Sequence, residues 1–111
     1  MDKMTEIPRI DEYDPAVIPD GHWIDKWGDE VWVKDGKWHR EDGPAFINTH
    51  GVEIWYKEGK QHHADGPALV TPGGKYHWFL NDRGYADFEK WLAANDEITD
   101  KQKVFLKLKY G

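Results

Sequence analysis

A 23-residue repeat is the feature that most constrains how this chain can fold. The stretch 32–47 reads WVKDGKWHREDGPAFI, and the stretch 55–70 repeats it as WYKEGKQHHADGPALV. A shorter third copy begins at Trp78. Self-similarity at a fixed period is typical of proteins that stack one small structural unit, because each unit buries its apolar face only against its neighbours. The repeat therefore predicts a stacked array.

Each repeat unit reads as two strands and two tight turns. A short apolar strand leads to a four-residue turn that ends in glycine, and a longer strand centred on tryptophan leads to a second turn at 35–36 or 58–59. Glycine supplies the positive φ angle that tight hairpin turns need. The longer strand 30–34 alternates, with Trp32 on one face and valines on the other. We therefore expect a mainly β fold (β+α), an antiparallel meander of about 2.5 repeats over residues 22–84, with both faces at least partly covered.

The tryptophans of the longer strands recur at the repeat period. Two strands per repeat would place equivalent residues about 9–10 Å apart across the sheet. Trp32, Trp55 and Trp78 are therefore predicted to form a file on one face. A core ladder that makes successive repeats stack is the favoured interpretation. An exposed aromatic strip that binds a partner is the alternative.

The first 21 residues differ from the repeats in composition. Residues 1–30 hold nine acidic and three basic residues, a net charge of −6, whereas residues 31–111 hold twelve of each. Three prolines between positions 8 and 19 exclude a long helix and a central strand. We therefore expect residues 1–21 to form an extended acidic arm held against the domain. A partly disordered terminus is the alternative.

The apolar period becomes helical in the last quarter of the chain. Aromatic residues and leucine recur at helical spacing over 85–95, which predicts an amphipathic helix. Thr99 is a suitable N-cap for a second helix, and the lysines of this helix are expected on a solvated face or in contact with the acidic arm. The two helices, within 85–111, are expected to cap the repeats. The predicted apolar stripe of the second helix is Val104, Phe105 and Leu108.

The composition narrows the chemistry that the chain can perform. It has no cysteine, which excludes disulfides and thiolate metal sites, and it has no serine. No apolar run approaches the roughly 18 residues of a membrane helix, and the first residues lack the layout of a signal peptide. The acidic balance argues against nonspecific nucleic-acid binding. We therefore expect a cytoplasmic protein that is not an enzyme and uses no cofactor.

Histidines recur in the repeat and raise the question of a metal site. His39 and His62 occupy equivalent positions, and Asp42 and Asp65 follow them three residues later. Paired imidazoles and carboxylates suit zinc, but groups that recur along a file do not converge on one ion. We expect instead that these side chains hydrogen-bond the backbone around the Gly-Pro corner. The metal site is the minor alternative.

The pattern Trp-x-x-x-Gly-Lys-x-His, with a glycine before each tryptophan strand, resembles the MORN family of β-hairpin repeats. The matching residues are Trp32, Gly36, Lys37 and His39, then Trp55, Gly59, Lys60 and His62. The continuation HREDGPA is similar to a divergent MORN-like repeat of small phage and viral proteins. The resemblance covers roughly residues 22–95, and the second copy departs from it at His63 and Ala64. It implies a twisted antiparallel meander, a role in protein or lipid contact, and no catalytic residues.

Together these observations favour a non-enzymatic protein-binding module. The resemblance also implies a phage-encoded accessory protein, cytoplasmic in the infected bacterium, that inhibits or redirects a host or anti-phage defence protein. The expected interface combines aromatic residues of the sheet face that the C-terminal helices leave uncovered with acidic residues that steer a basic partner. The candidate residues are Trp27, Trp32, Trp38, Trp55, Tyr56, Asp11, Glu12, Asp14 and Asp20.

Two other functions stay open. One is a nucleic-acid-binding protein that uses aromatic stacking and the C-terminal lysine-rich helix. The second is a small hydrolase or metal site built on the repeat histidines. Oligomerisation by sheet-edge pairing is a further expectation for an array with open edges.

Overall fold

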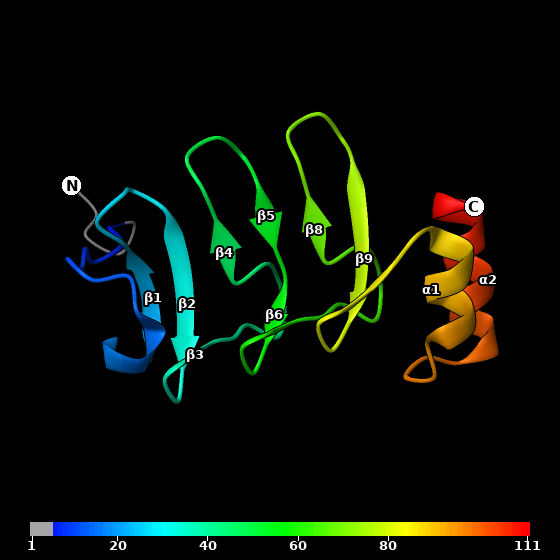
Figure 1. Ribbon diagram of the computed structural model, residues 1–111, viewed down its shortest axis with the longest axis horizontal. Coiled ribbons are helices and arrows are strands. Elements are labelled where there is room, and N and C mark those ends of the chain that lie inside the picture. The colour runs from blue at the N-terminus through cyan, green and yellow to red at the C-terminus, as the bar shows by residue number, and fades with distance from the viewer. Residues whose placement is uncertain (1–5) are drawn as a thin grey trace.

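The computed structural model describes residues 6–111 as a row of β-hairpins followed by two helices (Figure 1). A short 3-10 turn precedes the sheet. The elements are η2 Pro15–Val17, β1 Gly21–Ile24, β2 Glu30–Lys34, β3 Lys37–Trp38, β4 Phe46–Ile47, β5 Glu53–Ile54, β6 Tyr56–Lys57, β7 Lys60–Gln61, β8 Leu69–Val70, β9 Tyr76–Leu80, β10 Arg83–Tyr85, α1 Phe88–Ala94 and α2 Asp100–Tyr110.

The sheet follows the order of the chain. Its strands run β1-β2-β4-β5-β8-β9-β10, β3 pairs with β2, and β6 and β7 form a separate two-stranded ladder. Every neighbouring pair of these strands is antiparallel. In Figure 1 the turns of the hairpins β1–β2, β4–β5 and β8–β9 lie at the upper side of the view, and the turns after β2, β6 and β9 lie at the lower side. The prediction of a mainly β antiparallel meander followed by two helices is confirmed.

The turns on the lower side, which we call the lower tips, have the positive φ angles that the sequence predicts. A type I′ turn requires a positive φ at both central residues. The values are 51° and 74° at 35–36, and 50° and 82° at 58–59. The third lower tip has no glycine, and its Asn81 and Asp82 adopt 49° and 71°. Asn and Asp tolerate this left-handed region better than other side chains, so the turn type survives.

The larger buried apolar residues form two separate cores, one at each end of the sheet, and the buried Ala45 and Ala68 belong to neither. The first contains Ile18, Val31 and Val33, with Ile10, Trp23, Trp38 and Phe46 packed against it. The second contains Trp78, Leu80, Phe88, Trp91, Leu92 and Leu106. The helices contribute only to the second core, because α1 packs on β9 and β10 and both helices lie beyond the last strands in Figure 1.

The middle of the sheet is a single layer. Ile47, Ile54, Leu69 and Val70 are only half-buried, although they lie in the paired strands. Partial covering of both faces is as expected, whereas the expectation that the C-terminal helices would cover one face is wrong for the middle repeat, because both helices lie beyond the last strands. The alternation of the strands is nevertheless as predicted, since Val31 is fully buried while Trp32 on the opposite face is half-buried.

The N-terminal arm, from residue 6 onward, lies along the outer edge of the sheet. The Ile24 N–H donates to the Pro8 carbonyl at 2.9 Å, and the Ile10 N–H donates to the Ile24 carbonyl at 2.8 Å. This parallel bridge occupies the edge of β1 at Ile24. The first five residues of the predicted arm lie outside the described part of the chain.

Helix α2 starts at the predicted residue but buries the side opposite to the predicted one. Thr99 caps it with a full capping box that includes Gln102. Leu106 is 7% exposed and packs in the second core, whereas the predicted stripe of Val104, Phe105 and Leu108 is 57%, 62% and 79% exposed. The stripe has the right spacing, but the helix buries its opposite side because Leu106 and Tyr110, one turn apart, meet Trp78 and its neighbours. No helix within residues 6–111 is long and apolar enough to cross a membrane.

Replacing leucine by alanine at either of two positions in α2 tests which side of the helix is buried. Leu106→Ala is expected to lower the free energy of unfolding by about 2–5 kcal/mol, because it opens a cavity in the second core. Leu108→Ala is expected to change it by no more than about 0.5 kcal/mol, since that side chain contributes little buried area. Urea unfolding followed by tryptophan fluorescence measures both values. The opposite order would place the sequence-predicted stripe in the core.

Candidate functional site

The repeat histidines bind the lower tips of the sheet. In a type I′ turn the amide of the first central residue points out of the hairpin and needs an acceptor from elsewhere. The Glu58 N–H donates to His39 Nδ1 at 2.9 Å, and the Asn81 N–H donates to His62 Nδ1 at 3.0 Å. Each histidine therefore connects its own repeat to the tip of the next one.

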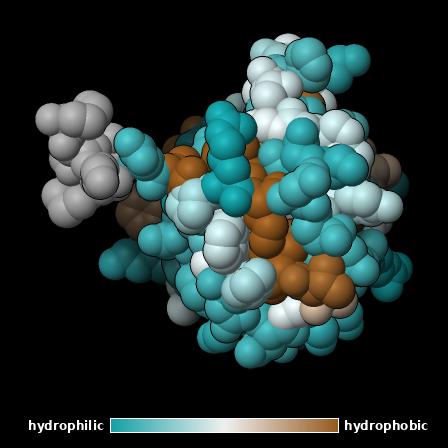
Figure 2. All heavy atoms as spheres, turned by 90° about the vertical axis from the view of Figure 1, so that its left-hand side faces the viewer, coloured by the Kyte–Doolittle hydropathy of each residue, from teal (hydrophilic) through white to brown (hydrophobic). Residues whose placement is uncertain are grey.

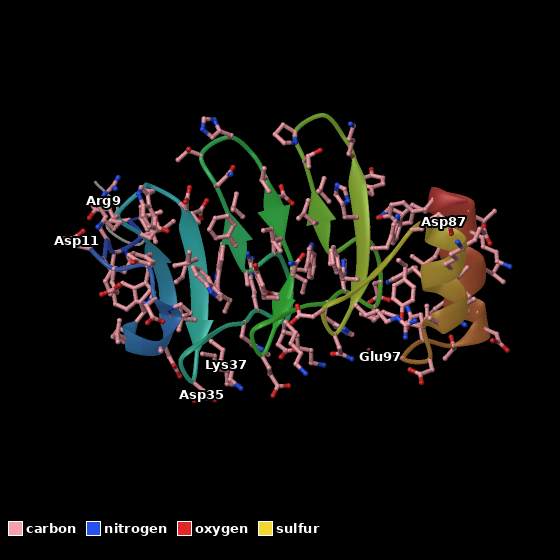
Figure 3. All side chains as sticks on the ribbon, viewed as in Figure 1. Arg9, Asp11, Asp35, Lys37, Asp87 and Glu97 are labelled. Carbon is pink, nitrogen blue, oxygen red and sulfur yellow. The ribbon has the colours of Figure 1, made fainter. Side chains whose placement is uncertain are left out.

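The first repeat has no repeat before it, and the arm supplies the missing acceptor. The Asp35 N–H donates to Asp20 Oδ1 at 2.7 Å. Asp35, at the lower tip of β2–β3 in Figure 3, is the equivalent of Glu58 and Asn81. The three tip amides thus have three acceptors, one carboxylate and two imidazoles.

The second nitrogen of each repeat histidine faces a carboxylate. His39 Nε2 bonds to Glu41, and His62 Nε2 lies 3.0 Å from a carboxylate oxygen of Glu97. Because Nδ1 accepts a hydrogen bond, the proton of the neutral ring is on Nε2 and points at the carboxylate. Both nitrogens are engaged, so neither ring is free to act as a general base or as a metal ligand.

Glu97 explains why the second repeat departs from the first. Ala64 stands where the first repeat has Glu41, and the carboxylate comes instead from the loop between α1 and α2 (Figure 3). The carbonyl of Ala64 accepts a hydrogen bond from the buried Asn95 side chain at 2.8 Å. The departure at this position therefore fits the repeat to the helical cap. Sequence reasoning missed Glu97 and Asn95, and the only signal was the lost carboxylate at position 64.

The Gly-Pro corner is held by the residue that follows each repeat histidine. The Arg40 guanidinium donates to the Pro44 carbonyl at 3.1 Å, and His63 Nδ1 bonds to the Pro67 carbonyl at 3.0 Å. The prediction that His39 and His62 hydrogen-bond this corner is therefore wrong. Their Nδ1 atoms accept from the neighbouring tip, and Arg40 and His63 bond the corner instead.

The remaining residues of the corner follow from close approach. A Cβ on Gly43 would come within 2.6 Å of Arg40 Cζ, and one on Gly66 would come within 3.1 Å of His63 Cε1. The alanines that follow, Ala45 and Ala68, are fully buried. Within the motif Asp-Gly-Pro-Ala, the glycine thus leaves room for the Arg40 or His63 side chain, the proline supplies the carbonyl acceptor, and the alanine is small enough to be fully buried.

The tryptophan file carries polar partners on its rings. Trp32 stacks on His22 with ring centroids 3.9 Å apart and planes 11° apart, and the Arg40 guanidinium lies 4.0 Å from the same ring. Trp55 stacks on His63 at 3.7 Å and 8°. Only Trp78 enters a core, where it meets Phe88 and Trp91. The file is thus neither a dry core ladder nor an open strip, because histidine and arginine cover the first two rings.

The opposite face presents a second aromatic pair. The rings of Trp38 and Tyr56 lie 6.2 Å apart, and Trp38 also meets the edge of Phe46 at 5.7 Å. Both Trp38 and Tyr56 are half-buried. Desolvation raises the pKa of Tyr56 above its ordinary value, and the nearby Asp82 adds to this effect. This pair combines buried area with partial access to solvent.

Trp27 lies at the other extreme of exposure. Its side chain is 58% exposed at the turn between β1 and β2, and its ring lies 5.0 Å from that of Tyr13. The Lys26 ammonium lies 5.9 Å and 5.7 Å from the Tyr13 and Trp27 rings. The structure thus separates Trp27 from the other four aromatic candidates and groups it with the arm.

Three of the four acidic candidates have structural partners. Glu12 accepts from the amides of Tyr13 and Asp14, and these bonds lower its pKa. Asp14 caps η2 by accepting from the Ala16 N–H at 3.0 Å, and Asp20 accepts from the first lower tip. Asp11 is exposed at the end of the molecule near Arg9 (Figure 3).

The polar side chains of the described residues do not assemble a metal centre. No group of three or more His, Asp or Glu in residues 6–111 is arranged to hold a metal ion. A hollow of about 420 Å³ between the lower tips is lined by Lys37, Lys57, Lys60, Glu58, Glu97, His62 and Asn81, which mixes both charges. Small-molecule sites are mostly apolar with a few polar groups, and this hollow is the reverse.

Comparison of the chain with protein-family models, with curated proteins and with solved structures gives no match.

Removing a repeat histidine is expected to destabilise the fold. His62→Ala leaves the Asn81 amide and Glu97 without their partner, and we expect a loss of about 1–3 kcal/mol of unfolding free energy. His62→Asn keeps an acceptor near the Nδ1 position and is expected to recover part of the loss. His50→Ala, at an exposed turn, is the control and is expected to be neutral. Equal stability of all three variants in urea unfolding would contradict the structural role.

The pH dependence of stability should report on His63. Burial lowers the pKa of this imidazole below its ordinary value, so the unfolded chain binds the proton more readily than the folded one. The resulting stability is present above the unfolded pKa of about 6.5 and is lost as the pH falls below it. His63→Arg places the residue of the first repeat at this position and should flatten the fall in unfolding free energy between neutral and mildly acidic pH. His50→Arg, with the same charge change at an exposed site, should keep the wild-type slope.

Proposed function

We propose that this chain is a non-enzymatic, MORN-like repeat protein whose function is to bind another protein through the faces of its sheet. The proposal rests on one observation: the aromatic and aliphatic side chains in the middle of the sheet are only half-buried on both faces, and no helix lies over either face there (Figure 1). Monomeric proteins rarely leave contiguous apolar surface in contact with water, and such surface often marks a binding site.

The aromatic pair Trp38 and Tyr56 is the strongest candidate for the centre of this interface. Tyrosine and tryptophan are the residues most often found at the energetic centres of protein interfaces, because they offer large area with few rotatable bonds. The two side chains are held in place by neighbours within the sheet, so a partner would order little on binding. Lower ordering cost favours affinity.

The proposed partner is a host protein or an anti-phage defence protein, which the chain would inhibit or redirect. The support for this step is the resemblance of HREDGPA to repeats of small phage and viral proteins. The acidic arm adds a net charge of −6 over residues 1–30, which would steer the chain toward a basic partner.

Nucleic-acid binding by aromatic stacking is the alternative proposal, and the ring partners argue against it. A base needs an open ring face, whereas the Trp32 ring has His22 and Arg40 against it and the Trp55 ring has His63. The lysines of α2 are the remaining support for this alternative.

Affinity capture from a nuclease-treated bacterial lysate tests the proposal. The wild-type chain is expected to enrich a protein that Tyr56→Ala enriches poorly, because loss of a central tyrosine weakens an interface by roughly 2 kcal/mol or more. Tyr76→Ala removes the same side chain from β9, where it is 47% exposed, and is expected to capture as the wild type does. Direct binding of the purified partner to the three baits by calorimetry then gives the affinities.

Two results would contradict the proposal. Equal affinity of all three baits would remove the Trp38–Tyr56 face as the interface. Capture that occurs from an untreated lysate but is lost from the nuclease-treated one would favour the nucleic-acid alternative.

A further inference from the structure

The large exposed hydrophobic side chains of the described residues gather at the two ends of the molecule. Three lie at the N-terminal end: Tyr13, Val17 and Trp27, which are 54%, 62% and 58% exposed. Three lie on α2 at the other end: Val104, Phe105 and Leu108. Tyr76 is the only further one in residues 6–111. We call the first set the head surface and the second set the tail surface.

The head surface lies where the arm and the first hairpin meet. Figure 2 looks onto this end and shows a hydrophobic strip bordered by hydrophilic side chains; its hydropathy scale does not colour tyrosine or tryptophan as hydrophobic, so the brown strip consists of residues other than Tyr13 and Trp27. Residues 6–30 hold eight acidic and two basic residues, so this end of the molecule is strongly acidic.

The tail surface has the opposite charge. Val104, Phe105 and Leu108 lie within about 100° of arc on α2, on the side opposite Leu106. The helix carries four lysines, at 101, 103, 107 and 109, against the single acid Asp100. The lysines therefore border an apolar strip that no described residue covers.

The two surfaces cannot meet within one molecule. The N-terminal arm lies at one end of a body 44 Å long and the helices lie at the other (Figure 1). The predicted contact between the lysine-rich helix and the acidic arm is therefore wrong within a single chain. It can form only between two copies.

We propose that copies of this chain associate head to tail, with the tail surface of one copy seated on the head surface of the next. The two surfaces are both apolar at the centre and opposite in charge, and α2, about 16 Å long, fits across an end whose other extents are 27 and 23 Å. A contact between different surfaces leaves a free head and a free tail, so the association extends beyond a dimer. It continues the repeat axis from one copy to the next.

Other occupants of the tail surface fit less well. Two copies joined tail to tail would bring eight lysines together, which opposes association. An anionic membrane would attract α2, but the chain as a whole has a net charge of −6 and would be repelled. The acidic, apolar head surface is the one that complements the tail surface in both charge and hydrophobicity.

Sedimentation velocity on two blocked variants tests the proposal. Val17→Gln with Trp27→Gln blocks the head, and Phe105→Gln with Leu108→Gln blocks the tail, without changing any charge. At low salt the wild type is expected to exceed the dimer mass as its concentration rises, whereas each blocked variant alone remains a monomer. An equimolar mixture of the two should give a dimer and nothing larger, since it contains one working head and one working tail. Tyr76→Gln is the control and should associate as the wild type does.

Three results would overturn the proposal. They are a wild type that stays monomeric throughout, a head-blocked variant that dimerises alone, and a mixture that stays monomeric while the wild type associates. Co-sedimentation of the monomeric wild type, but not the tail-blocked variant, with phosphatidylserine vesicles would assign the tail to membranes instead. Circular dichroism establishes that each variant is folded. The experiment uses purified chain alone, so its outcome is independent of the captured partner proposed above.

Discussion

The backbone amide at each lower tip is the constraint on which the rest of the array depends. A type I′ turn presents this N–H away from its own hairpin, and an unpaired amide costs free energy unless water or a side chain accepts from it. His39 and His62 supply the acceptor from the preceding repeat, and Asp20 supplies it for the first. The bond fixes the position of one repeat relative to the next. The geometry of each turn therefore helps to set the alignment of the repeats along the whole sheet.

The same logic explains the two ends. A repeat array has an unpaired unit at each terminus, and this chain closes one with an arm and the other with helices. The arm provides Asp20 and bonds the edge of β1, and the cap provides Glu97 for His62 and Asn95 for the carbonyl of Ala64. The cores form only at these ends. In between, the repeats are joined through tips, corners and strand ladders, and no second layer is needed.

The sequence was sufficient for the features that depend on neighbouring residues. Alternation at 30–34 predicted the strand, Asp35-Gly36 predicted the turn, and Thr99 predicted the start of α2. It failed where the partner is distant in the chain. His39 accepts from a backbone amide nineteen residues away. Every residue except proline has such an amide, so the sequence does not show which one the histidine will bond. The inward side of α2 was misjudged because Val104, Phe105 and Leu108 have helical spacing as good as that of Leu106 and Tyr110. Only the shape of the core around Trp78 decides between the two stripes.

Stability and surface are therefore separated in this fold. The lower tips and Gly-Pro corners join the repeats through hydrogen bonds to backbone, and these bonds involve His39, Arg40, His62 and His63. The faces of the middle repeat contribute half-buried side chains to no closed core, so their identity is less constrained by folding than that of the corner residues. A chain built this way can change its faces while it keeps its corners. The repeated Asp-Gly-Pro-Ala is therefore required by the fold, and of the residues that differ between copies those at the corner, Arg40 and His63, still make the same bond to a proline carbonyl.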